Sequence, residues 1–266
     1  MPFDLRRLPK RVSTLDFLRG VLVLIVILIH GTRIVQARPF HAATPSTSAS
    51  IPGEVMLGEL FTFDIAFKNT GGDEGYGPFI DVVFPYNNGD GIDFNTGTGA
   101  TYLGQKLDCS IATFNNQEKA THPFAKDTSG NLIVITGPTG SEGNKLVSCK
   151  LPFGSFVSSQ PEVKVTYNAT MSATADPSTA LTFRSRGGFQ FGEDPLDNWC
   201  CDAVKLNPSQ NTIDDWPGND VDPTLITTNK IMTPGTGSEF ETATGPNYVS
   251  QYTISVNIAD GQTIDS

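Results

Sequence analysis

The clearest pattern in the chain is a strict alternation of apolar and polar residues between Leu60 and Lys68. The apolar positions are Phe61, Phe63, Ile65 and Phe67, and polar or small residues separate them. A period of two predicts a β-strand with one buried side and one side that faces solvent.

A second alternation of the same kind lies close to the C-terminus, over Tyr252–Ile258. Turn residues flank both alternating segments: Pro52-Gly53 and Asn69-Thr70-Gly71 for the first, Gly245-Pro246-Asn247 and Asp260-Gly261 for the second. We therefore expect a tandem array of β modules, of which residues 225–266 are the incomplete start of a second.

Further strands are predicted where short apolar or alternating runs stand between turn residues. They are Phe79–Phe84, Leu132–Thr136, Leu146–Leu151, Val163–Met171, Leu181–Arg184 and Leu225–Met232, with turns at residues 87–91, 137–138 and 187–188. No amphipathic helix follows residue 37, so the pattern predicts an all-β sandwich over residues 51–224. Residues 38–50 are small and polar and are predicted to be a linker.

The N-terminus has the pattern of an export signal. Four basic residues between Arg6 and Arg11 precede the apolar run Gly20–Ile29, and Val35-Gln36-Ala37 offers a cleavage site after Ala37. The alternative is an uncleaved anchor, in which case the only membrane contact is through residues 15–37. Either way the fold is preceded by a signal or anchor helix, and we expect an extracellular or cell-surface location.

The charge of the chain argues against nucleic acid as a partner. Residues 1–37 hold six of the 18 basic and two of the 28 acidic side chains, so the remainder carries a net charge of −14. Phosphate backbones repel such a surface.

The four cysteines are Cys109, Cys149, Cys200 and Cys201. An even number in an exported chain favours disulfides. Adjacent cysteines pair only with strain, so Cys200 and Cys201 are not expected to pair with each other. The simplest bridge joins Cys109, at a strand edge, to Cys149 in the strand Leu146–Leu151, and the state of Cys200 and Cys201 is left open.

Three segments resemble large bacterial surface proteins that carry tandem immunoglobulin-like repeat domains. They are residues 52–85 (PGE, FTFDIAFKNTG and IDVVFP), residues 151–198 (LPFGSF, QP, GGFQFG and DPLDN) and residues 252–264. The resemblance implies an immunoglobulin-like β-sandwich, a structural or adhesive role outside the cell, and further repeats downstream.

A second resemblance covers residues 11–30 only. Arg11, the run Leu15–Gly20 and His30 are similar to the first membrane helix of multi-span acyltransferases. It implies a less favoured alternative, a fragment that carries the N-terminus of a membrane enzyme.

Oxygen-rich loops make calcium the one metal to consider. Asn87, Asp90, Asp93 and Asn95 lie in a glycine-rich stretch, and calcium prefers several hard oxygen ligands in such a loop. A polar turn explains the same residues. Calcium is therefore a possible cofactor here, and no other is predicted.

No catalytic residue is predicted. No G-x-S-x-G segment is present, and Gly137–Leu146 departs from a phosphate-binding loop because Asn144 separates Gly143 from Lys145. The sequence thus predicts a non-enzymatic module with a surface ligand, protein or glycan. The alternative is a carbohydrate-binding module of a secreted enzyme, in which Trp199 and Trp216 stack on sugar rings.

Overall fold

The protein is described by a computed structural model that covers residues 42–194, 204–232 and 252–262 in interpretable detail. The predicted signal segment, Trp199, Cys200 and Cys201 lie outside the described residues. Within the described part, no helix is long and apolar enough to cross a membrane.

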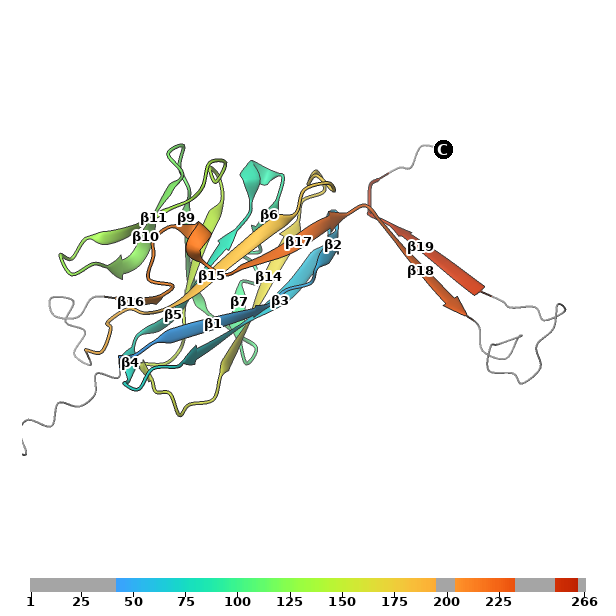
Figure 1. Cartoon of the computed structure of the whole chain (residues 1–266). Coiled ribbons are helices and arrows are strands. Elements are labelled where there is room, and N and C mark those ends of the chain that lie inside the picture. Colours follow the sequence, from blue (N-terminus) through green and yellow to red (C-terminus); the bar gives the residue numbers. More distant parts are fainter. Residues whose placement is uncertain (1–41, 195–203, 233–251, 263–266) are drawn as a thin grey trace, which may run out of the picture. The chain divides into compact units, whose positions relative to one another are not determined.

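The fold is an immunoglobulin-like β-sandwich of two main sheets (Figure 1). The first sheet has the order β1-β3-β14-β7-β8, and β6 also pairs with β14. Its strands are β1 (Pro45–Ser50), β3 (Leu60–Asn69), β6 (Ile92–Phe94), β7 (Ala100–Tyr102), β8 (Gln105–Lys106) and β14 (Val163–Met171). All its described pairings are antiparallel.

The second sheet has the order β2-β17-β15-β5-β12-β9, and β16 also pairs with β15. Its strands are β2 (Glu54–Met56), β5 (Pro78–Phe84), β9 (Asp108–Thr113), β12 (Lys145–Lys150), β15 (Leu181–Phe189), β16 (Lys205–Asn207) and β17 (Gly218–Thr224). Only the β2–β17 pairing is parallel among those that the structure describes. A short separate pair is formed by β4 (Gly75–Tyr76) and β13 (Ser155–Phe156).

The main core lies between the two sheets and is rich in aromatic rings. Phe63 on β3 stacks on Tyr167 of β14, with ring centroids 5.3 Å apart, and contacts Phe183 of β15 at 4.7 Å. The predicted alternation is confirmed at Phe63, Ile65 and Phe67, which are buried while Thr62 and Lys68 are exposed. It is less regular at Phe61, which is only partly buried, and at Ala66, which is buried.

The outer face of the second sheet is also covered, which the sequence did not predict. Strands β10 (Lys119–Lys126) and β11 (Leu132–Thr136) pair with each other, and a segment that includes the short helix η2 (Ile213–Asp215) lies nearby. Val83 of β5 packs beneath these elements in a cluster that includes Ile135 and Trp216. Phe79 of β5 packs in a second cluster with Ala125 and Ile133. Every residue of β5 is consequently buried.

Two segments differ from the sequence expectations. Pro45–Ser50, assigned by composition to a linker, pairs along its whole length with β3 as strand β1. Gly187-Gly188, expected to form a turn, lies inside β15. A side chain at Gly188 would overlap the ring of Phe79, so glycine is needed there for close packing and not for a turn.

The last two strands, β18 (Ile226–Met232) and β19 (Tyr252–Ile258), pair with each other and with no other described strand. The register puts Ile254 opposite Lys230 and Val256 opposite Thr228. Ile254 and Val256 remain 66% and 54% exposed. Both strands were predicted, whereas their assignment to a second module stays a prediction.

We expect limited proteolysis with chymotrypsin to cut within Thr233–Thr244 and to leave a resistant fragment that retains the sandwich from β1 (Pro45–Ser50) to the end of β17 at Thr224. A lone pair of strands is marginally stable in water, since it cannot bury an apolar face. Mass spectrometry of the fragments is the measurement. Equal resistance of residues 225–266 and the sandwich would assign them to one module.

Candidate functional site

A buried ion pair joins the two central strands of the second sheet on the sheet's outer face. The Asp81 carboxylate on β5 lies 3.0 Å from Nε of Arg186 on β15, and both side chains are fully buried. Burying two charges is costly unless the remaining hydrogen-bonding atoms also find partners. The surroundings of this pair therefore decide whether it stabilises the fold.

Ser148 and His122 supply those partners to the carboxylate. The Ser148 hydroxyl donates to Oδ1 of Asp81 at 2.6 Å, and Nε2 of His122 lies 2.9 Å from the same oxygen. Nδ1 of His122 accepts from the backbone N–H groups of Ala125 and Phe124, at 2.8 and 3.2 Å. Since Nδ1 is an acceptor, the proton of a neutral ring resides on Nε2, which donates to Asp81.

These partners keep Asp81 ionised. Burial by itself raises the pKa of this carboxyl, but His122, Arg186 and Ser148 outweigh it and lower the pKa to about 2. Asp81 is therefore a carboxylate throughout the physiological pH range.

Arg186 carries the same network into the segment that covers the sheet. Its Nη1 donates to the carbonyl oxygen of Gln210 and to Oδ1 of Asn211, both at 3.1 Å, whereas its buried Nη2 has no hydrogen-bond partner among the described residues. Its guanidinium lies over the Trp216 ring, 4.1 Å from the centroid, and Trp216 donates from Nε1 to Gln210. Side chains from β5, β10, β12 and β15 thus join the covering segment in one connected group, which we call the Asp81 network.

The Asp81 network contains a serine, a histidine and an aspartate, but it is not arranged for catalysis. The Ser148 oxygen lies 3.2 Å from Nε2 of His122, but its hydroxyl donates to Asp81 at 2.6 Å, and Nδ1 of His122 is occupied by backbone donors. Asp81, Ser148 and His122 are each 0% exposed, so no substrate can reach the hydroxyl. The network holds layers together.

Sequence reasoning missed this network. One signal was present, because Asp81 is the single charged residue within the apolar run Phe79–Phe84. A charge inside a buried strand requires a partner. The sequence did not identify the partners, because Arg186, His122 and Ser148 are separated from Asp81 by 41 to 105 residues along the chain.

The predicted cysteine pair is joined in the structure. Cys109 on the edge strand β9 and Cys149 on β12 face each other directly in the register and form a disulfide, with their Cα atoms 4.0 Å apart. Cys149 is fully buried in the main core. The bridge therefore fastens an edge strand to the centre of the sandwich.

The four candidate calcium ligands lie in or beside the loop between β5 and β6, and the side chains of three of them, Asp90, Asp93 and Asn95, have protein partners. Asp93 forms an ion pair with Lys145 at 2.6 Å, and Asp90 accepts from the Thr174 hydroxyl at 2.6 Å. Oδ1 of Asn95 accepts from backbone N–H groups at residues 97 and 98, and the Asn87 backbone donates to Asn144. Among the described residues, no group of three or more acidic, histidine or cysteine side chains converges as a metal site.

Calcium binding at this loop stays a prediction, and the ion pair of Asp93 with Lys145 would oppose it. Calcium must replace Lys145 at the Asp93 carboxylate, so we expect affinity no tighter than millimolar. Calorimetric titration should give less heat with an Asp90→Ala/Asp93→Ala variant than with the unaltered chain. Indistinguishable titrations would leave the loop as a turn only.

Of the two tryptophans considered for sugar stacking, Trp216 is 2% exposed and packs against the covered face of the second sheet. It cannot offer its ring to a ligand. Trp199 lies outside the described residues.

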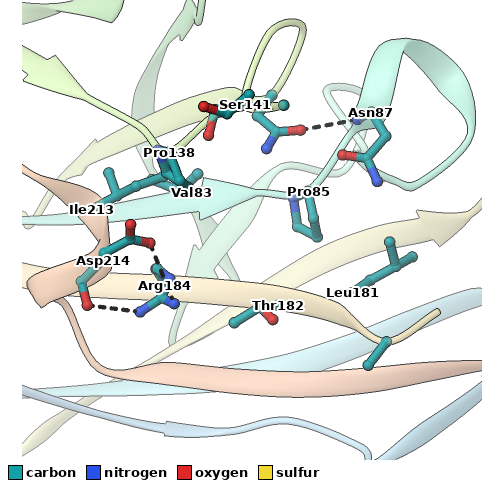
Figure 2. Close-up of a pocket in the computed structure, with 14 residues that line it drawn as sticks. Val83, Pro85, Asn87, Pro138, Ser141, Leu181, Thr182, Arg184, Ile213 and Asp214 are labelled. Carbon is teal, nitrogen blue, oxygen red and sulfur yellow. Dashed lines mark hydrogen bonds and ion pairs between the residues drawn. The ribbon is translucent and has the colours of Figure 1, made fainter. Parts of the chain in front are cut away.

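A surface pocket of about 220 Å³ lies where the β11–β12 turn meets β15 and η2 (Figure 2). Polar and apolar residues both line it: Val83, Pro85, Asn87, Pro138, Thr139, Gly140, Ser141, Asn144, Ala180, Leu181, Thr182, Arg184, Ile213 and Asp214. Arg184 donates from Nη1 to the carbonyl oxygens of Asp214 and Trp216, at 3.2 and 2.8 Å, and its Nη2 lies 3.6 Å from the Asp214 carboxylate. The Asp81 network is thereby connected to one wall of the pocket, since Trp216 packs against Arg186 and its carbonyl oxygen accepts a hydrogen bond from the lining residue Arg184.

Comparisons with known proteins place the chain in no family. No family model matches it, and no curated protein matches its sequence.

Several solved structures resemble the fold at low identity. The structure of AvmM, which catalyses macrocyclization in alchivemycin A biosynthesis, has a TM-score of 0.34 and 9% identity over 69% of this chain and 89% of that chain. A cohesin module of a family 33 glycoside hydrolase from Clostridium perfringens has a TM-score of 0.30 and 10% identity over 68% and 99%. A 35 kDa C-terminal fragment of a major pilin from Streptococcus agalactiae has a TM-score of 0.29 and 12% identity over 71% and 57%. Other bacterial pilins and a membrane-anchored protein are among the similar structures.

Proposed function

We propose that this chain is a non-enzymatic structural or adhesion module that works outside a bacterial cell, as the N-terminal part of a larger surface or secreted protein. The observation that carries the proposal is that the side chains of the Asp81 network are buried and bonded to one another. Asp81, His122, Ser148 and Arg186 are sealed inside the molecule and hold its layers together. Such an interior supports a durable scaffold rather than a reaction centre.

The Cys109–Cys149 disulfide supports the proposed location. Disulfides form and persist in oxidising compartments and are rare in the cytosol. Residues 1–37 provide the matching export signal, cleaved after Ala37 or retained as an anchor.

Protease treatment of intact bacteria tests this function. Intact cells that produce the full chain with a C-terminal tag should lose the tag signal of their surface fraction when protease is added. A chain that is secreted should instead be found with its tag in the medium. A variant without residues 1–37 should retain the signal inside protected cells, because export requires that segment. Equal protection of both proteins would contradict an extracellular role.

A further inference from the structure

We propose that the pocket at the β11–β12 turn is a binding site for a neutral, hydroxyl-rich ligand, a single sugar ring at the end of a glycan. This inference rests on the proposed adhesive role and deepens it by naming the ligand class. The pocket residues come from segments far apart in the sequence, and Figure 2 shows Ser141, Asn87, Arg184 and Asp214 around one opening.

The first argument is the supply of hydrogen-bonding groups without protein partners. Ser141 is 3% exposed and Thr139 is exposed, and within the described residues neither hydroxyl makes a hydrogen bond to another protein group. Neither oxygen is among the described buried side-chain atoms that lack a partner, which are the Tyr167 hydroxyl and Nη2 of Arg186. Both hydroxyls therefore reach solvent, and a ligand hydroxyl can replace water as their hydrogen-bonding partner.

The second argument is charge. The two charged side chains that line the pocket, Arg184 and Asp214, have opposite signs and lie 3.6 Å apart. Their charges largely cancel, and two Nη1 hydrogen bonds of Arg184 already go to backbone carbonyls. A phosphate or carboxylate therefore meets an occupied guanidinium and a neighbouring carboxylate, whereas neighbouring hydroxyls of a sugar can donate to Asp214 and accept from Thr139 and Ser141.

The third argument is shape and lining. Pro138 and Ala180 are exposed apolar residues of the lining against which the C–H face of a ring can pack, whereas Leu181 and Ile213 are buried. The volume of about 220 Å³ is below the range of roughly 300–1,000 Å³ that holds drug-sized ligands. It suits one ring rather than an extended chain of sugars.

The site is also held rigid. Arg184 binds the carbonyl oxygen of Trp216, and Trp216 is clamped by Arg186 of the Asp81 network. Pre-formed geometry reduces the ordering cost of binding, which matters for a small ligand with few contacts.

Titration of the isotope-labelled full chain, followed by amide NMR signals, tests the proposal. The probes are glucose, galactose, mannose and N-acetylglucosamine, with inorganic phosphate as the anionic comparison. At least one neutral sugar should move the signals of residues 139–144, 182–184 and 213–214, and phosphate should not. A Ser141→Ala/Thr139→Val variant should weaken that binding roughly five-fold for each hydroxyl removed.

A Thr62→Val variant is the matched control, because Thr62 is an exposed threonine on β3 of the other sheet. It should bind as the unaltered chain does, and the spectra themselves report whether each variant is folded. The proposal is overturned if no sugar moves the pocket signals, if the Ser141→Ala/Thr139→Val variant binds unchanged, or if phosphate acts as strongly. A chain found on the cell surface without sugar binding would overturn this site and leave the proposed structural role in place.

Discussion

An Asp81→Ala variant is expected to lose about 3–5 kcal/mol of its free energy of unfolding at neutral pH. Removing the carboxylate leaves the Arg186 guanidinium charged and buried without its counterion. It also deprives the Ser148 hydroxyl and Nε2 of His122 of their acceptor. Because these donors lie on three different strands, the loss is expected to loosen the β10–β11 cover as well as the sheet. Urea denaturation followed by tryptophan fluorescence measures the change.

The control for this experiment is an Asp64→Ala variant. Asp64 forms an ion pair with Lys164 at 3.4 Å on the exposed side of the first sheet, where the lysine side chain is 64% exposed. Exposed pairs contribute about 0–1 kcal/mol, so this variant should unfold close to the unaltered chain. An Asp81→Leu/Arg186→Met variant should recover part of the lost stability, because it removes both buried charges together. If the Asp81 and Asp64 variants had the same unfolding midpoint, the Asp81 network would not be a stabilising element.

Acid should reproduce the effect of the Asp81 substitution in the unaltered protein. The folded-state pKa of Asp81 is lowered to about 2, below the value of about 4 for an unfolded aspartate. Its contribution to stability is therefore fully present above about pH 5 and is lost as the pH falls from about 4 towards 2. An Asp81→Asn variant should lack this part of the acid unfolding profile.

The strands that the sequence predicted well are those with one regular face. Leu132–Thr136 and Val163–Met171 have the same bounds in the structure as in the prediction. Along Val163–Met171 buried residues alternate with exposed or partly exposed ones, which is the periodicity that a sequence displays directly.

The third layer escaped prediction because its other strand, β10, was not recognised, and β11 was predicted without the face that it covers. Strand β10 contains Pro123, and its pairing with β11 shifts between Thr121 and Lys126, as a bulge at a proline requires. Strand β5 shows no regular alternation of apolar and polar residues for a different reason: both of its faces are buried.

The same argument explains which of the candidate sites could be predicted from the sequence. The Cys109–Cys149 pair could be inferred as the simplest bridge between two predicted strand segments, whereas the Asp81 network and the pocket depend on which faces three layers bring together. The pocket walls come from the turn after β11, from β15 and from η2. A strand assignment alone cannot place them side by side.

Loss of the Cys109–Cys149 disulfide is expected to lower the free energy of unfolding by about 4 kcal/mol. The bridge spans a separation of 40 residues, and the chain-entropy model gives about that value for such a loop. In the folded protein β9 already pairs with β12, so the constraint acts mainly on the unfolded chain. The measurement is urea denaturation of the unaltered chain with and without a reductant.

A Cys109→Ser/Cys149→Ala variant should match the reduced protein and should not respond to the reductant. Alanine is chosen for Cys149 because that side chain is fully buried and a hydroxyl there would lack a partner. A Cys200→Ser/Cys201→Ser variant should keep the full response to the reductant, which assigns the effect to the first pair. Alkylation before reduction should leave Cys109 unlabelled in the exported protein. A labelled Cys109, or an unfolding midpoint that reduction does not change, would remove the disulfide from the account of how this sandwich withstands conditions outside the cell.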